Sequence, residues 1–208
     1  MTTLDTTMPR SAQVRRTTRE TTIELTLQLD GTGGCDARSG LPFLDHMLAA
    51  LCLCARFDLT LRCSGDLEVC DHHTVEDAAL CLGRALDQAL GERRGIARFA
   101  DALAPLDEAL VRVVIDLSGR PWPAVRLPFV RERLGTVATE NLVHFLQSLA
   151  IAARMALHVD LLVGDNDHHK AEAAFKATGL ALRRAVALDP LPADGGVAAV
   201  PSTKGVLS

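Results

Sequence analysis

The sequence lacks the features that mark secreted and membrane proteins. No stretch of its 208 residues approaches the roughly 20 consecutive apolar residues that a membrane-spanning helix needs. The opening segment, MTTLDTTMPR, has neither the charged start nor the apolar run of a secretory signal. We therefore expect a cytoplasmic protein.

Concentrated positive charge and nucleotide-binding motifs are also missing. The 22 basic and 26 acidic residues are interspersed and give a formal net charge of −4, so no basic stripe is available for nucleic acid or anionic lipid. Neither a G-x-G-x-x-G fingerprint nor a P-loop occurs. The cysteines lack CxxC spacing and fall within predicted helices and strands, so we expect buried, reduced thiols. They are Cys35, Cys52, Cys54, Cys63, Cys70 and Cys81.

What is present is enough apolar sequence for a core, 48% of the chain, arranged in clear periodic patterns. TTIELTLQL at 21–29 alternates as a strand does, and Asp30-Gly31 follows as a turn signal. Pro42 opens a helical run over 41–53, and strand alternation returns at 57–63. A long helical pattern then follows Asp71 and stops at Gly91.

The second half of the chain repeats this order, with predicted strands at 110–117 and 158–163 and predicted helices at 136–155 and 168–188. DHHTVEDAALCLGRAL at Asp71 and DHHKAEAAFKATGLAL at Asp167 share residues as well as pattern. We infer an internal duplication of a roughly 90-residue unit. The predicted fold is α+β, with two sheet-plus-helices layers facing each other. The expected division is a loose N-terminus at 1–12, repeats at 13–100 and 101–190, and a tail at 191–208.

The histidines predict two metal sites. On a helix, residues i and i+4 share a face, so His72 can chelate an ion with Glu76, and His168 can do so with Glu172. The adjacent residues His73 and His169 turn about 100° away, which directs them towards an ion held mainly by the other half. On the preceding helices, the natural fourth ligands are His46 and His144.

Three imidazoles and one carboxylate on each ion suit octahedral Mn²⁺ or Fe²⁺ better than a closed zinc site, although the sequence leaves Fe²⁺ and Zn²⁺ open. His158 lies in an alternating strand outside this scheme, and we interpret it as structural.

Several long motifs resemble the imidazoleglycerol-phosphate dehydratase family, and the resemblance covers nearly the whole chain. They are LPFLDHML (41–48), DHHTVED (71–77), SGRP (118–121), NDHHKAEAAFKA (166–177) and PSTKGVL (201–207). The resemblance implies a duplicated fold of the ribosomal protein S5 domain 2-like type, with the halves packed around a pseudo-twofold axis. It also implies conversion of imidazole glycerol phosphate to imidazole acetol phosphate in histidine biosynthesis, within a large closed homo-oligomer whose sites lie between subunits.

By the same resemblance, two Mn²⁺ occupy each active site and favour an imidazolate form of the substrate. The first would be held by His46, His73, His168 and Glu172, and the second by His72, Glu76, His144 and His169. Substrate would contact Glu20, Arg98, Arg120, Ser202, Thr203 and Lys204. The expected catalytic residues are Glu20, as the base, with His72, His73 and Glu172. Without the resemblance, an Arg or Lys is usually a solvated charge.

The sequence departs from the family pattern at Cys54, where a His is usual, and at Cys70, where an Asp is usual. A changed neighbour of a metal ligand can lower affinity or activity 10-fold or more. Three alternatives therefore stay open: a dimetal hydrolase acting on phosphoesters, a metal-storage or metal-sensing oligomer without catalysis, and a paralogue that has lost activity. No second catalytic unit is evident, so we do not expect one of the family's bifunctional fusions.

Overall fold

The structure, a computed structural model, describes residues 10–189 and 199–207, and its elements follow the same order twice. The first half contains β1 (Ser11–Thr17), β2 (Thr21–Gln28), β3 (Cys35–Arg38), α1 (Pro42–Ala55), β4 (Asp58–Gly65) and α2 (His72–Leu90). The second contains β5 (Phe99–Leu106), β6 (Ala109–Asp116), β7 (Trp122–Arg126), β8 (Arg133–Leu134), β9 (Val137–Ala138), α3 (Thr139–Ala152), β10 (Ala156–Val163) and α4 (Asp167–Ala185).

The sheets confirm the predicted duplication. The first has the order β1-β2-β4-β3 and the second the order β5-β6-β10-β7, so equivalent strands take equivalent places. In each sheet the last pair, β4 with β3 or β10 with β7, is parallel and the other pairs are antiparallel. The additional hairpin of β8 and β9 lies in the second half only, before α3.

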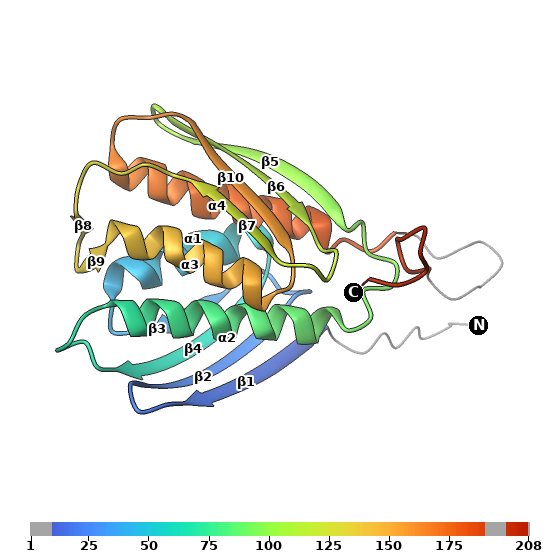
Figure 1. Ribbon diagram of the computed structural model, residues 1–208, viewed down its shortest axis with the longest axis horizontal. Helices are drawn as coiled ribbons and strands as arrows, with labels where there is room; N and C mark the ends of the chain where they lie inside the picture. The colour runs from blue at the N-terminus through green and yellow to red at the C-terminus, as the bar shows by residue number, and fades with distance from the viewer. Residues whose placement is uncertain (1–9, 190–198, 208) are drawn as a thin grey trace.

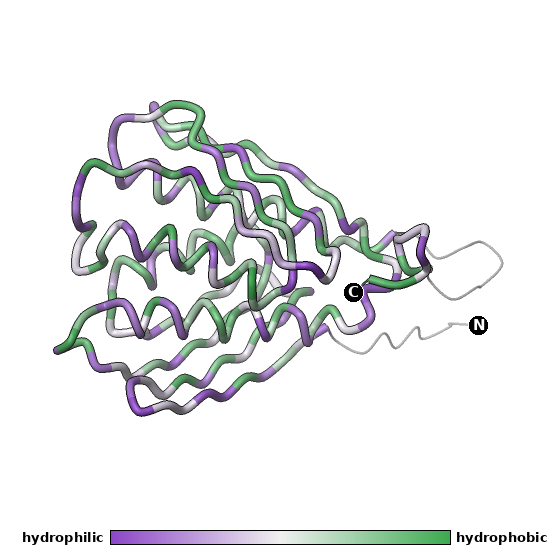
Figure 2. The backbone as a smooth tube through the Cα atoms, in the orientation of Figure 1, coloured by the Kyte–Doolittle hydropathy of each residue, from purple (hydrophilic) through white to green (hydrophobic). Residues whose placement is uncertain are grey.

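The helices lie between the two sheets, which form the outer layers (Figure 1). Strand β2 shows why: Ile23, Leu25 and Leu27 are buried against the helices, while the residues between them are exposed. The same alternation of hydrophobic and hydrophilic residues is visible along both sheets (Figure 2). Each half thus buries one sheet face under its own helices, as the layered α+β prediction requires.

The two halves meet through their helices, with α2 packed against α3 and α4 against α1. Exchanging the halves turns one of these contacts into the other, which is the relation expected for a pseudo-twofold axis. The close approach depends on equivalent glycines. A Cβ on Gly83 would lie 2.7 Å from the Leu149 carbonyl oxygen, and one on Gly179 would lie 2.3 Å from the Leu51 carbonyl oxygen.

The element boundaries differ from the predictions in three places. Strand β1 pairs with β2 from Ser11 onward, so Ser11 and Ala12 belong to the sheet and not to a loose segment; residues 1–9 lie outside the described part of the chain. Helix α3 starts at Thr139 and not at 136, because the β8–β9 hairpin extends to Ala138. Helix α4 ends at Ala185 and not at 188, because the following backbone bonds to residues 95–98.

Strands β1, β3, β5 and β7 and the short β8–β9 hairpin were not predicted. Neither CDAR of β3 nor WPAVR of β7 shows the apolar alternation of a half-buried strand. Within the described residues, none of the helices combines the length and the apolar character needed to cross a membrane.

Candidate metal and substrate site

One cluster of possible metal ligands joins the two halves at the α1–α4 contact. His46 of α1 and His168 of α4 place their Nε2 atoms 3.1 and 3.2 Å from Oε2 of Glu172. The other Glu172 oxygen is 2.6 Å from Nζ of Lys176. Although burial works against ionisation, the Lys176 ammonium and the His46 imidazole hold the pKa of Glu172 below its ordinary value.

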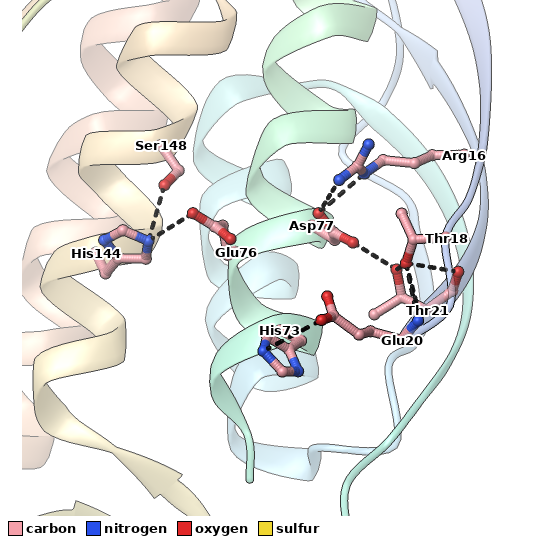
Figure 3. Close-up of polar contacts among 9 residues, drawn as sticks. All are labelled: Arg16, Thr18, Glu20, Thr21, His73, Glu76, Asp77, His144 and Ser148. Atoms are coloured by element: carbon pink, nitrogen blue, oxygen red, sulfur yellow. Dashed lines mark hydrogen bonds and ion pairs between the residues drawn. The ribbon is translucent and has the colours of Figure 1, made fainter. Parts of the chain in front are cut away.

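A second cluster occupies the equivalent place at the α2–α3 contact. His144 Nε2 lies 3.1 Å from Oε1 of Glu76 and 3.4 Å from the Ser148 hydroxyl, as Figure 3 shows. The rings of His72 and His144 stack with centroids 4.8 Å apart. Because α2 corresponds to α4 and α3 to α1, the pseudo-twofold axis exchanges the two clusters.

Both clusters fit a divalent cation by the chemistry of their donors. Each offers two imidazole nitrogens and one carboxylate oxygen, all within 4.8 Å of one another. Imidazole and carboxylate together suit Mn²⁺, Fe²⁺ or Zn²⁺. Two histidines and one glutamate leave room for a fourth protein ligand and for substrate. The structure therefore places six of the eight predicted ligands in the predicted combinations.

The remaining two predicted ligands, His73 and His169, lie outside both clusters in the single chain. His73 Nδ1 is 3.0 Å from Oδ2 of Asp66, and His169 Nδ1 is 2.7 Å from Oε2 of Glu108. These carboxylates raise the pKa of each imidazole. As predicted, His73 and His169 point about 100° away from the preceding histidine. This turn directs each ring to the side of its helix away from the cluster, where it contacts its own half of the chain and not the other half.

A carboxylate bonded to Nδ1 leaves Nε2 as the ring nitrogen that His73 and His169 could offer to a cation. Ligating histidines usually have such a partner, which fixes the orientation and tautomer of the ring. Glu108 also accepts the backbone N–H of Asn166, and these contacts lower its pKa to about 2, so it is ionised at neutral pH. The rings are thus oriented without completing either cluster of their own chain.

His72 is oriented differently, by Asn141 at the start of α3. Its Nδ1 lies 3.0 Å from Oδ1 of Asn141, whose amide nitrogen donates to Asp71. Asp71 is the N-cap residue of α2, but its side chain makes no capping hydrogen bond to the helix. Its carboxylate also accepts the backbone N–H of Ala138 in the other half. Burial opposes ionisation of Asp71, and these hydrogen bonds outweigh it, so its pKa is lowered.

Glu20 lies in the turn between β1 and β2 and points towards α2 (Figure 3). Its Oε1 is 3.8 Å from Nε2 of His73, and its backbone carbonyl accepts the N–H of Asp66. The side chain is half exposed. The structure therefore brings the predicted base to a predicted metal ligand, on the opposite side of α2 from the Glu76–His144 pair.

The predicted phosphate-binding residues lie elsewhere. Arg98 donates to both oxygens of Asp116, at 2.7 and 3.1 Å, and to the carbonyl of Pro201 at 2.8 Å, which brings the tail segment Ser202, Thr203 and Lys204 close to it. Its backbone N–H bonds to Ala185 at the end of α4. His168 stands at the start of α4, about 25 Å away at roughly 1.5 Å per residue.

Arg120 follows β6, which ends at Asp116, and so lies at the same end of the molecule as Arg98. Figure 1 shows this end, close to the C-terminus, opposite the end where α2, α3 and α4 begin. A single chain therefore does not bring the predicted metal ligands and the predicted phosphate ligands together.

Three further residues lie outside the clusters: Cys54 and Cys70, which differ from the family pattern, and His158. Cys54 packs on α4, where a Cβ on Gly179 would come within 3.0 Å of it, and burial raises the pKa of its thiol. Cys70 is half-buried directly before Asp71. His158 lies on the outer side of β10, away from both clusters. Four residues around the clusters were not predicted from the sequence: Asp66, Glu108, Asn141 and Lys176. Of these, only Lys176, at i+4 from Glu172, has a helical spacing that could have indicated it.

Comparison with known proteins shows the family of this chain. A family model described as imidazoleglycerol-phosphate dehydratase matches residues 39–182. The enzyme of that name from Roseiflexus sp. (strain RS-1) is 52% identical over 198 residues, which cover 95% of this chain and 98% of that protein. The one from Phytophthora nicotianae is 53% identical over 96% of this chain, which spans 43% of that protein. The crystal structure of the Pyrococcus furiosus enzyme in complex with (S)-C348 matches with a TM-score of 0.78 at 36% identity, covering 93% of this chain and 100% of that one. On these matches, the chain belongs to the imidazoleglycerol-phosphate dehydratase family.

Proposed function

We propose that this chain dehydrates imidazole glycerol phosphate to imidazole acetol phosphate, using two divalent cations and the His/Glu clusters described above. The reaction is that of a hydro-lyase in histidine biosynthesis, in keeping with the family. The observation that carries the proposal is the pair of clusters, each with two imidazoles and one carboxylate within 4.8 Å, related by the internal duplication. A catalytically silent storage protein would have no need of Glu20 beside a histidine or of the Arg98–tail contact.

The first cation would be held by His46, His168 and Glu172 and the second by His72, Glu76 and His144. By resemblance to the family both are Mn²⁺. When bound, such cations supply positive charge that favours the deprotonated form of the substrate imidazole and so helps its side chain to lose hydroxide.

Glu20 would remove the carbon-bound hydrogen that must leave with the hydroxyl. That hydrogen is not next to a carbonyl, so a positioned base is required, and the carboxylate of Glu20 projects freely beside His73. Loss of the proton and the hydroxyl leaves an enol, which tautomerises to the ketone product. Water, the second product, takes its oxygen from the substrate hydroxyl.

The phosphate would bind Arg98, Arg120 and Lys204, with Ser202 and Thr203 adding neutral hydrogen bonds. Guanidinium groups suit phosphate because their N–H groups can donate in pairs. The bidentate contact with Asp116 holds the Arg98 guanidinium in place, and the Pro201 carbonyl on the same group anchors the tail.

Complete sites would form between chains of a homo-oligomer. Within one chain, His73 and His169 lie outside the clusters, and Arg98 lies at the far end of α4 from His168. A neighbouring copy could supply both the missing imidazole and the phosphate site. The large closed oligomers of the family would provide this arrangement.

The direct test is a turnover assay of the metal-reconstituted protein on imidazole glycerol phosphate, with bound metal quantified in the same sample. We expect ketone product, two cations per chain and no inorganic phosphate. Release of phosphate would instead support the dimetal hydrolase, and metal binding without turnover would support the storage or inactive alternatives.

Complementation tests the intersubunit site. Glu172→Gln and Arg98→Ala should each be inactive alone. In a mixed assembly made from equal amounts of both, random pairing restores about a quarter of the sites if each site takes its cluster and its arginine from different chains. A mixture that stays inactive, with mixed assemblies shown by native mass spectrometry, would place both residues in one site of a single chain and contradict the arrangement.

A further inference from the structure

The carboxylate of Glu20 depends on its backbone for its position. Among the described residues it accepts no hydrogen bond, and its side chain is half exposed beside His73. The backbone of the turn, in contrast, is tightly held. The N–H groups of Glu20 and Thr21 both donate to the hydroxyl oxygen of Thr18, at 3.1 and 2.9 Å, and the Thr18 N–H donates to the Thr21 carbonyl at 2.9 Å. The contacts that fix this turn therefore fix the direction of the Glu20 side chain.

A buried carboxylate of α2 joins the turn to the helix, as Figure 3 shows. Asp77 is only 3% exposed, accepts the hydroxyl hydrogen of Thr21 and pairs with Arg16 of β1, whose Nε lies 2.9 Å from Oδ1. His73 and Asp77 are four residues apart and so share a face of the helix. The same face of α2 therefore holds the turn and lies opposite the carboxylate of Glu20.

The hydrogen bonds around this turn run in one direction. A carboxylate paired with a guanidinium only accepts, so the Thr21 hydroxyl gives its one hydrogen to Asp77. The Thr18 hydroxyl has two acceptors at 3.4 Å, the hydroxyl and the carbonyl oxygen of Thr21, and can donate to either. Its own oxygen stays free to accept the two backbone N–H groups. Removing either hydroxyl therefore breaks the connection between Asp77 and the turn.

The described part of the second half has no such network at the equivalent place. Helix α4 has Ala173, fully buried, where α2 has Asp77, and the hairpin from β5 to β6 turns in two residues, Asp107 and Glu108. Packing of the helix on its sheet thus does not require a charged group at this position. Burying such a group costs free energy unless it is paired and hydrogen-bonded. The network occurs in the half that carries Glu20, which favours a functional role over a structural one.

We propose that four residues, the turn network, position Glu20 for its role as the base: Arg16, Thr18, Thr21 and Asp77. They act through the backbone of the turn, which directs the carboxylate to the side of α2 where His73 lies. The inference rests on the proposed function, because it takes Glu20 as the base. None of the four belongs to either His/Glu cluster, so breaking the network should lower kcat and leave cation binding unchanged.

The test compares Thr18→Ala with Thr18→Ser in the full-length, Mn²⁺-loaded protein. Alanine removes the oxygen that accepts both N–H groups, whereas serine keeps it. Because a misplacement of about 1 Å can cost about 100-fold in rate, Thr18→Ala should lower kcat about 10- to 100-fold. KM and bound Mn²⁺ should stay within about threefold of wild type, and Thr18→Ser should restore most of kcat. Thr22→Ala, at an exposed position of β2, is the control and should match wild type.

Amide hydrogen exchange at single-residue resolution gives a readout that does not depend on turnover. In metal-free protein, Thr18→Ala should speed exchange of the Glu20 and Thr21 N–H groups about 10-fold or more, while Thr18→Ser and Thr22→Ala should not. Thr21→Val keeps the shape of the side chain, removes its hydroxyl and should lower kcat as Thr18→Ala does. The double variant should be no slower than either single variant, because both changes break the same chain of hydrogen bonds.

Three results would overturn the positioning role in a wild-type protein that turns over substrate. They are a kcat for Thr18→Ala within about threefold of wild type, a Thr18→Ser variant as slow as Thr18→Ala, and unchanged exchange at the turn. Wild-type protein without turnover would instead contradict the proposed function, and would exclude the role of Glu20 with it.

Discussion

The close approach of α4 to α1 makes Gly179→Ala a sharp test of the helix packing that forms the first cluster. A Cβ at this position would lie 2.3 Å from the Leu51 carbonyl oxygen, 3.0 Å from Cys54 Cβ and 3.1 Å from the Ala55 amide nitrogen. Two of these neighbours are helix backbone, which cannot rotate away as a side chain can. The helices must therefore separate by on the order of 1 Å to restore van der Waals distances.

The magnitude follows from two opposing effects. Alanine in place of a helical glycine stabilises the helix itself by about 0.5–1 kcal/mol. Overpacking a close contact costs about 1–3 kcal/mol. We expect a net loss of about 1–2 kcal/mol in the free energy of unfolding, which lowers Tm by roughly 2–8 °C for a chain of this size. The sign of the change in Tm is informative by itself, because the higher helix propensity of alanine would raise Tm if there were no clash.

Thermal unfolding followed by circular dichroism, at one protein concentration and without added metal, measures this effect. A Mn²⁺ titration adds a second readout: separating α1 from α4 moves His46 away from Glu172 and should weaken that site about 10-fold. Gly83→Ala is the matched variant and should weaken the other cluster instead, because its Cβ would lie 2.6 Å from Ala152 Cβ on α3. An unchanged or higher Tm for Gly179→Ala would refute the packing argument.

Three further predictions test the orientation of a ligand, the base and a surface ion-pair network. Asn141→Ala removes the partner of His72 Nδ1 and should raise the Kd for metal about 10- to 100-fold. The control Glu140→Ala, on the exposed side of α3, should leave this Kd unchanged. Equal Kd values for the two variants would contradict the role of Asn141. Glu20→Gln should retain both cations but lower kcat about 10²- to 10⁴-fold, and turnover within a few-fold of wild type would exclude Glu20 as the base. Hydrogen bonds from Arg112 and Arg126 lower the pKa of Asp160, so Asp160→Asn should cost at most about 1 kcal/mol at pH 7, since both arginines are largely exposed. Because the folded-state pKa is the lower one, this difference is complete above the unfolded pKa and is lost as pH falls through the folded value. Urea unfolding should therefore show a smaller difference between Asp160→Asn and wild type at pH 2.5 than at pH 7.

The amino-acid sequence by itself determined the duplicated α+β organisation and named the residues that form the two His/Glu clusters. Alternation in TTIELTLQL and the helical spacing of His72 with Glu76 are local signals, since each depends on a few neighbouring residues and on backbone geometry alone. The same locality explains the predictions that were wrong. The inclusion of Ser11 and Ala12 in β1, the start of α3 and the end of α4 depend on pairing with other segments, which a local pattern does not contain.

Only the tertiary structure decided how the predicted ligands group and what orients them. His46 meets Glu172, 126 residues away, because α1 packs on the helix of the other half, and Asn141 reaches His72 across the equivalent contact. It also decided that His73 and Arg98 lie outside the clusters of their own chain. The spacing of residues along a helix fixes which of them share a face. Which segment packs against that face depends on how the two halves dock, through the helix contacts at Gly83 and Gly179.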